Sequence, residues 1–348
     1  MKRFVVLTSF LSALVSCAVN VPTPEADNGA CEYAKYFEIS HQGTPSVITV
    51  SPYDGRRDTL AISKSMDNII CMSSSNVAAL VEIGADSVIT AVSGLKYISS
   101  SSVRDVPDIG YESSLDYEKI MSLSPDLLVT YTVSGAQPPY LGKLRSLGIP
   151  VLVLHDHLEN HPLARAEYMR LFGVLTGREA YADSVFTSVR DRYLEKVASV
   201  ESCGNARKKV LLNIPYGDAW YVPGADSYMA RIISDAGGEV LGAEAGTSSS
   251  RTISLEQAYL LSRQADLWLN PGHCRTRDEL SQVHRLFPRF GPLDKGLPIY
   301  NNTLRTTPEG GNDFWESGAV RPDLVIEDLL SIMSDDSDAS FCYFFPLP

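Results

Sequence analysis

Aromatic and basic residues recur in the loops that follow short apolar segments typical of buried strands. The guanidinium groups of Arg275 and Arg305 suit an anionic ligand, because a planar fork can donate two parallel hydrogen bonds to carboxylate or catecholate oxygens. Tyrosine and tryptophan side chains add large flat contact surfaces. We predict ligand contacts from Lys96, Tyr97, Tyr131, Tyr216, Trp220, Tyr221, Arg275, Arg305 and Trp315.

The alternative for each of these residues is a structural role. A loop arginine is usually exposed to solvent, and a loop tryptophan often covers the core beneath it. Trp315, in the glycine-aromatic loop 310–316, and Tyr228 are the two for which a structural role is expected first. The prediction therefore concerns the group rather than any single member.

Common motifs of catalysis are missing from the sequence. It has no G-x-S-x-G nucleophile elbow, no H-E-x-x-H zinc motif, no Walker loop and no G-x-G-x-x-G after a predicted strand. A binding protein without a cofactor is therefore expected rather than an enzyme.

The first 17 residues have the features of a lipoprotein signal peptide. Lys2 and Arg3 precede an apolar run over 4–14 that is too short to span a bilayer. The junction Leu14-Val15-Ser16-Cys17 resembles the bacterial lipobox, which implies lipidation of Cys17 and a stable membrane anchor. The alternative is an ordinary secretory signal that happens to contain a cysteine.

Charge and cysteine content narrow the class of partner. A formal net charge of −12 opposes binding to nucleic acid or to an anionic membrane through the body of the protein. After Cys17 an odd number of cysteines remains, without metal-binding spacing. Their pairing is left open: Cys31, Cys71, Cys203, Cys274 and Cys342.

Residues 46–161 alternate strands with helices and predict an N-terminal α/β lobe with a mostly parallel sheet. Asp54-Gly55 predicts a hairpin turn between the first two strands, and residues 18–45 predict a flexible tether without a core. The predicted strands are Ser46–Val50, Thr59–Ser63, Ile69–Met72, Val88–Val92, Leu127–Tyr131 and Val151–Leu154, and the predicted helices lie near Asn76–Ile83, Tyr117–Leu123 and Pro139–Ser146.

Residues 162–202 predict one long helical element, interrupted by Gly173 and Gly177. A helix from about 180 to 202 would be roughly 35 Å long, enough to run along two lobes. Its second part carries an apolar stripe at three- and four-residue spacing: Ala182, Val185, Val189, Tyr193, Val197 and Val200.

Residues 203–348 repeat the first pattern and predict a C-terminal α/β lobe. The predicted strands are Val210–Asn213, Asp266–Asn270 and Leu297–Asn301, and the predicted helices are Ser227–Asp235, Ser254–Ser262 and Pro322–Met333. The fold class is therefore α/β, with two Rossmann-like lobes joined by a long backbone helix. A ligand is expected between the lobes, at the carboxyl ends of the strands.

Several phrases along this pattern resemble one protein family. The segment Glu118–Val129 is similar to the family phrase E-x-I-x-x-L-x-P-D-L-V, and companion phrases stand at Leu147–Val151, Ser254–Ala258, Ala265–Trp268 and Arg321–Val325. Their order over about residues 66–333 resembles the class III periplasmic substrate-binding proteins of siderophore, heme and cobalamin ABC importers. The resemblance implies a monomeric, lipid-anchored periplasmic protein that works with a permease dimer and its ATPase.

The resemblance also implies a role for two glutamates. In this family one glutamate on each lobe docks into arginine-bearing pockets of the permease, and the matching positions are Glu118 and Glu256. Two separated carboxylates on a rigid body can steer and orient docking. The alternative is a solvated glutamate that stabilises the first turn of its helix.

A histidine cluster offers a competing metal site. His155, Asp156, His157 and His161 have ligand chemistry for a transition metal. All of them lie in one connection before the long helical element, whereas a site between lobes should draw ligands from both. We therefore expect a solvated loop at the helix entry and no metal site.

The expected ligand is a ferric siderophore, because the two loop arginines favour an anion. Cobalamin needs fewer formal charges, heme would need an axial ligand such as Tyr97 or His273, and a zinc or manganese ion is a further alternative. Because a helix connects the lobes, we expect modest opening and a nearly preformed site.

Overall fold

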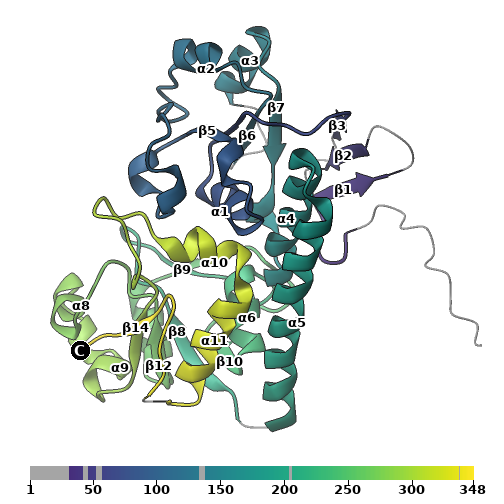
Figure 1. The fold of residues 1–348 in the computed structure, drawn as a ribbon. Coiled ribbons are helices and arrows are strands. Elements are labelled where there is room, and N and C mark those ends of the chain that lie inside the picture. Colours follow the sequence, from purple (N-terminus) through teal and green to yellow (C-terminus); the bar gives the residue numbers. More distant parts are fainter. Residues whose placement is uncertain (1–30, 42–45, 52–56, 133–137, 204–205, 337) are drawn as a thin grey trace, which may run out of the picture.

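The chain folds into two α/β lobes connected by a pair of helices (Figure 1). The computed structural model describes residues 31–41, 46–51, 57–132, 138–203, 206–336 and 338–348. The predicted signal peptide with Cys17 and the turn at Asp54-Gly55 lie outside these residues. In the described part of the chain, no helix combines the length and apolar character needed to cross a bilayer.

The N-terminal lobe is built on a parallel sheet with the strand order β5-β4-β6-β7. Its strands are buried on both faces, as expected of a parallel sheet that helices cover on both sides. Helix α1 shares one core with this sheet, and α2 and α3 share the core on its other face. The bounds are Ile69–Cys71 for β4, Ile89–Val92 for β5, Leu127–Tyr131 for β6, Val151–Leu154 for β7, Ser74–Glu82 for α1, Tyr117–Leu123 for α2 and Pro139–Ser146 for α3.

A separate antiparallel sheet packs on this lobe and includes residues that the sequence assigned to the tether. Strands β1 (Phe37–Ser40), β2 (Ser46–Val50) and β3 (Asp58–Ile62) pair in that order. Strands β2 and β3 pair antiparallel, as the predicted hairpin requires, but in a sheet separate from the parallel one. The tether predicted over 18–45 is wrong for residues 31–40, because Phe37 and Ile39 are buried in the core of the N-terminal lobe.

Two helices connect the lobes, so the single element predicted over 162–202 is wrong. Helix α4 (Pro162–Thr176) ends at Gly177, whose positive φ of 67° reverses the chain into α5 (Glu179–Cys203). The two helices pack closely, because a methyl group on Gly173 would overlap the β-carbon of Ala182. The 25 residues of α5 span about 37 Å.

The apolar stripe predicted along the second helix is confirmed. Ala182, Val189 and Tyr193 are buried, and the other predicted stripe residues are partly buried. The helix pair contributes to both lobes, since Phe172 and Phe186 belong to the N-terminal core whereas Leu163 and Tyr193 belong to the C-terminal core.

The C-terminal lobe contains a five-stranded sheet with the order β10-β8-β12-β13-β14, parallel except for β14 at the edge. A two-stranded antiparallel ribbon, β9 with β11, stands beside it. The strands are β8 (Lys208–Leu212), β9 (Trp220–Val222), β10 (Gly238–Val240), β11 (Arg251–Ile253), β12 (Leu267–Leu269), β13 (Ile299–Asn301) and β14 (Phe345–Pro346). The helices are α6 (Tyr228–Asp235), α7 (Leu255–Ser262), α8 (Arg277–Val283), α9 (Gly291–Asp294), α10 (Ser317–Val320) and α11 (Pro322–Met333).

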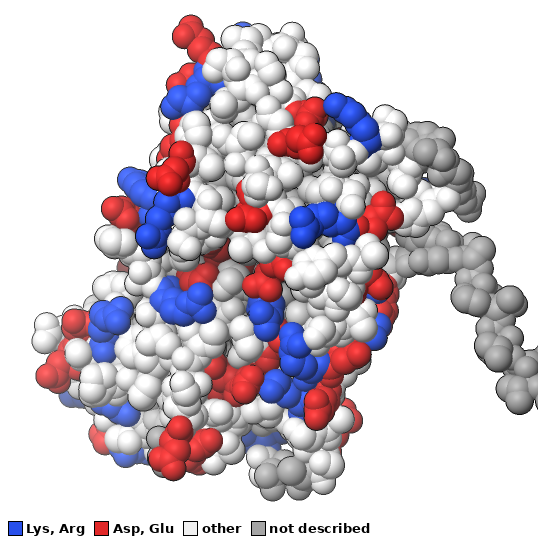
Figure 2. Space-filling model, viewed as in Figure 1, with Lys and Arg blue, Asp and Glu red and all other residues white. Residues whose placement is uncertain are grey.

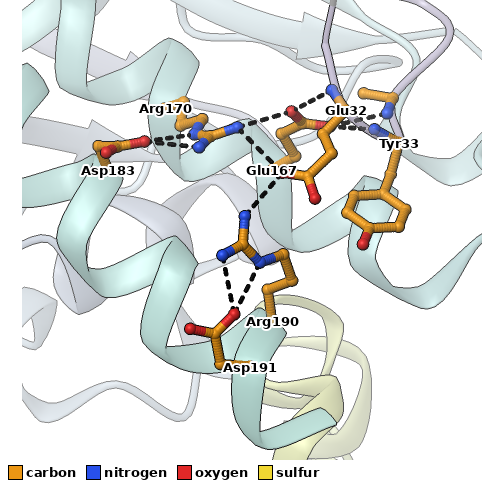
Figure 3. A network of polar contacts seen from close by, with 8 residues as sticks. Glu32, Tyr33, Glu167, Arg170, Asp183, Arg190 and Asp191 are labelled. Carbon is orange, nitrogen blue, oxygen red and sulfur yellow. Dashed lines mark hydrogen bonds and ion pairs between the residues drawn. The ribbon is translucent and has the colours of Figure 1, made fainter. Parts of the chain in front are cut away.

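Residues 31–36, which we call the rear strap, are held on the helix pair by a buried carboxylate (Figure 3). Glu167 of α4 is fully buried and accepts hydrogen bonds from the backbone N–H groups of Glu32, Tyr33 and Ala34, at 2.7–2.8 Å. Such charge-assisted bonds offset part of the cost of burying the carboxylate.

Two arginines extend this network along the helix pair (Figure 3). Arg170 pairs with Glu167 at 3.1 Å and with Asp183 of α5 at 2.6 Å, and so ties α4 to α5. Arg190 of α5 pairs with Glu32 of the rear strap at 3.0 Å. The strap and both helices therefore form one connected polar unit.

Candidate ligand-binding site

A cavity of about 600 Å³ lies between the lobes, beside the carboxyl ends of β5 and β13. This volume is within the range of small-molecule sites. We call it the front cavity. The N-terminal lobe contributes Leu95, Lys96, Ile98, Ser99 and Arg104, and the C-terminal lobe contributes Leu304, Arg305, Thr306, Thr307, Pro308 and Glu309.

The wall from the N-terminal lobe is a pair of short 3-10 turns after β5, Leu95–Tyr97 and Ser101–Val103. Gly94 begins the first turn at a φ of 69°, a conformation that favours glycine. The carboxylate of Asp108 accepts hydrogen bonds from the backbone N–H groups of Gly94 and Leu95, at 3.1 and 2.9 Å. These bonds fix the start of the segment that carries Lys96.

The wall from the C-terminal lobe is a tight loop after β13. Thr306 pairs with Asn312 as an antiparallel bridge, and the backbone N–H of Asp313 donates to the carbonyl of Arg305 at 3.1 Å. The guanidinium group of Arg305 also forms an ion pair at 2.7 Å with the carboxylate of Asp313, which is buried. The guanidinium group of Arg305 is therefore held in place at the cavity.

The charge of the front cavity differs from that of the whole chain. Among its lining residues, Lys96, Arg104 and Arg305 are basic and Glu309 is acidic, whereas the whole chain carries a net charge of −12. Figure 2 shows basic side chains on both lobes along their boundary, with acidic ones among them. Cationic groups from two sides of one cavity suit an anionic ligand.

Two predicted ligand residues, Lys96 and Arg305, line this cavity together. Tyr97 follows directly, with a side chain that is 41% exposed and a ring centroid 6.3 Å from that of Tyr111. Arg104 was not among the predicted ligand residues, because no predicted strand ends close to it. The other predicted residues do not line the front cavity.

The predicted ligand contact of Trp220 must be corrected, because this residue is 1% exposed and belongs to the core. The alternating burial of β9 turns this residue inward, where its ring stacks on Phe290 at 5.8 Å. Its indole N–H donates to the carbonyl of Leu212 at 3.0 Å, so the polar atom of the ring is satisfied within the lobe.

The remaining predicted contacts are spread over both lobes. Tyr216 and Tyr221 are exposed near the β9–β11 ribbon, and Arg275 lies over the ring of Phe345 at 5.1 Å. Trp315 is 45% exposed and packs edge-on against Phe314. Tyr131 is partly buried beside His157, and Tyr228 is buried under the guanidinium group of Arg165.

The histidine cluster is not the solvated loop that the sequence predicted. His155 and Asp156 are buried, and the Asp156 carboxylate accepts a hydrogen bond from Ser75 at 2.7 Å. The His161 ring accepts a bond from the backbone N–H of Leu163 and so caps α4, and burial lowers the pKa of this histidine to about 4. Among the residues that the structure describes, no group of three His, Cys, Asp or Glu side chains could hold a metal ion.

Glu118 and Glu256 occupy equivalent places in the two lobes. Each is exposed in the first turn of its helix, α2 or α7. Hydrogen bonds from the local backbone and from Ser254 lower the pKa of Glu256. Both carboxylates are therefore available to a partner at the surface.

The cysteines whose side chains the structure describes, Cys31, Cys71, Cys274 and Cys342, are free thiols. Burial raises the pKa of Cys71 to about 12, which keeps its thiol protonated and unreactive. The side chain of Cys203 is outside the described set.

The chain matches the family model for periplasmic binding proteins over residues 69–284. It belongs to this family. Periplasmic binding proteins of known structure share the fold: a periplasmic heme binding protein from Pseudomonas aeruginosa superimposes with a TM-score of 0.63 at 18% identity, over 81% of this chain and 98% of the other.

Two curated relatives of this periplasmic binding protein match most of its length. An uncharacterized lipoprotein of Methanocaldococcus jannaschii is 25% identical over 79% of this chain and 67% of its own length. A cobalamin-binding protein of Halobacterium salinarum is 26% identical over 71% of this chain and 62% of its own length, so the match leaves over a third of that relative uncovered.

Proposed function

We propose that this chain captures an anionic metal chelate in the front cavity and delivers it to the permease of an ABC importer. A ferric siderophore is the first candidate. The supporting observation is the convergence of Lys96 and Arg104 from one lobe with Arg305 from the other, in a chain that is acidic as a whole. A multiply charged catecholate or carboxylate chelate complements such a site.

Cobalamin and heme are the alternative ligands, and the names of relatives and structural neighbours mention both. Cobalamin carries fewer formal charges than a ferric siderophore, so it would form fewer ion pairs with the three cationic groups of the cavity. Heme would use the exposed phenol of Tyr97 beside the cavity as an axial ligand. The charge of the cavity supports a siderophore over these two ligands.

Delivery requires a partner in the membrane. We infer that Glu118 and Glu256 dock on the two permease subunits, because each is an exposed carboxylate at the start of an equivalent helix. The lipidated residue would be Cys17, and its acyl chains would tether the protein to a membrane on the periplasmic side. The relative whose name reads lipoprotein supports this anchor.

The test is a titration of the purified protein with ferric catecholate, ferric hydroxamate, hemin, cobalamin and zinc. Binding is followed by tryptophan fluorescence, with Trp315→Phe to identify the reporter, because Trp220 and Trp268 are buried and Trp315 is exposed. We expect a ferric catecholate to bind most tightly, with an affinity that falls as salt concentration rises.

Matched arginine variants locate the site. Arg104→Gln and Arg305→Gln should each weaken catecholate binding about tenfold or more, the effect of losing one charge-assisted hydrogen bond. Arg275→Gln is the control, because this exposed arginine is outside the cavity lining. Unchanged affinity in both cavity variants, or tighter binding of cobalamin or hemin, would overturn the proposal.

A further inference from the structure

The lobes also meet through contacts beside the front cavity, which we call the front junction. The hydroxyl of Thr307 donates to the carbonyl of Lys96 at 2.9 Å, and a methyl group on Gly311 would overlap the carbonyl oxygen of Tyr97. Farther along, Val320 is buried in the core of the N-terminal lobe. The C-terminal lobe therefore contacts and hydrogen-bonds the segment of the N-terminal lobe that forms the opposite wall of the cavity.

A buried carboxylate holds the centre of this junction. Glu316 is 3% exposed, and its two oxygens each accept one backbone hydrogen bond from the N-terminal lobe, from Ser99 at 2.7 Å and from Ser100 at 2.9 Å. Ser99 itself lines the front cavity, three residues after Lys96 and five before Arg104. The carboxylate thus fixes the middle of the cationic wall.

We propose that Glu316 is a positioning residue, whose bonds to Ser99 and Ser100 set the distance between the cationic groups of the two lobes in the front cavity. Its effect on ligand affinity rests on the proposed function, whereas its effect on the junction does not. A side chain that accepts both hydrogen bonds is required, because an unpaired buried N–H group is costly.

The junction should also respond to pH. Burial, together with the nearby charge of Asp313, raises the pKa of Glu316 to about 7. Separation of the lobes would return this carboxyl to water, where a glutamate titrates near 4.3. The closed junction therefore binds the proton more tightly, so acidification from pH 8 to pH 5 favours closure and a rise in pH through 7 weakens it.

Other charged groups surround Glu316 and must be separated from its effect. Arg305 pairs with Asp313 on the side of the C-terminal lobe, and Arg321 pairs across the junction with Glu82 of α1 at 3.4 Å. Lys96 and Arg104 face the same cavity from the N-terminal lobe. A variant that changes Glu316 alone isolates its contribution.

The experiment is amide hydrogen exchange on the ligand-free full chain, with Glu316→Gln. The glutamine side chain has one oxygen that can accept a hydrogen bond and one NH₂ group that can only donate. One of the two backbone N–H groups, of Ser99 or Ser100, would therefore lose its acceptor and face the NH₂ group, which is another donor. We expect protection over residues 95–104 to fall about tenfold or more at pH 7. In the wild type this protection, corrected for intrinsic exchange, should rise from pH 8 to pH 5, and in the variant it should stay flat.

Glu159→Gln provides the matched control. Glu159 is also buried, with a pKa raised to about 7, but it accepts from Lys35 and Tyr36 of the rear strap. Its variant should leave protection over 95–104 unchanged. Equal protection of this segment in the wild type and in Glu316→Gln would overturn the proposal.

The ligand titration separates the two proposals. If a chelate binds the wild type but Glu316→Gln changes neither affinity nor exchange, the positioning role fails and the proposed function stands. If exchange responds as expected and no chelate binds, the junction is real and the proposed function fails.

Discussion

The rear and the front of the molecule join the two lobes by different means. At the rear, α4 and α5 connect them covalently, and Glu167 with two arginines binds the rear strap to both helices. At the front, side chains and close backbone contacts hold separate segments together through Glu316, Thr307 and Gly311. The difference indicates that the rear supplies stability, whereas the front sets the geometry of the cavity.

Removal of the buried carboxylate of Glu167 tests whether the rear network stabilises the fold. Glu167→Ala should lower the free energy of unfolding by about 3 kcal/mol, because three backbone N–H groups and Arg170 lose their shared partner. Urea denaturation measures the change. Asp183→Ala is the control, since this largely exposed partner of Arg170 should contribute about 0–1 kcal/mol. Equal losses in both variants would show that the rear network is not a source of stability.

Two glycines test the division of roles directly. Gly311→Ala should weaken chelate binding about tenfold with a small change in unfolding, because the added methyl group forces the lobes apart at the front. Gly173→Ala should leave chelate binding nearly unchanged and lower the free energy of unfolding by about 1–3 kcal/mol, because the added methyl group overlaps Ala182 in the packed helix pair. The higher helix propensity of alanine offsets part of this loss. Similar profiles of affinity and unfolding in the two variants would remove the distinction.

A smaller effect should come from the charge of Glu159 alone. Burial raises the pKa of this carboxyl to about 7, above that of an exposed glutamate, so its contribution to stability is complete below about pH 4.5 and is lost as the pH rises through 7. In Glu159→Gln, one oxygen can still accept both strap N–H groups, as it does in the wild type. The free energy of unfolding of the variant should therefore exceed that of the wild type by about 1–2 kcal/mol at pH 8. At pH 5 the two proteins should differ little. Urea midpoints at the two pH values decide, and identical pH dependence in both proteins would contradict the assignment.

Much of the fold could be predicted from the sequence because the local patterns are regular. The bounds of α2, α3, α11, β6 and β7 agree with those predicted, since each has a clear apolar period between breakers such as proline and glycine. The short ribbon strand that holds Trp220 has no such pattern. Its inward orientation depends on Phe290, a residue distant in the chain.

The site was predictable only in part, because its geometry depends on contacts between remote segments. Lys96 and Arg305 each follow the carboxyl end of a parallel strand, one in each lobe, a position for site residues that general rules for α/β folds anticipate. Glu316 meets Ser99 across 217 residues, and Glu167 meets Glu32 across 135. No local pattern reports such pairs, and the proline, asparagine, aspartate and glycine residues before residue 31 led to a predicted tether that wrongly included the buried strand Phe37–Ser40.

The sharing of α4 and α5 between both lobes has a consequence for folding. Phe172 and Phe186 complete the N-terminal core, and Leu163 and Tyr193 complete the C-terminal core on the same two helices. Unfolding of either lobe would expose the apolar residues of α4 and α5 that pack in its core. The helix pair would then be less stable and would pack less well against the other lobe. The molecule should therefore melt as one cooperative unit rather than in two stages, despite its bilobal shape.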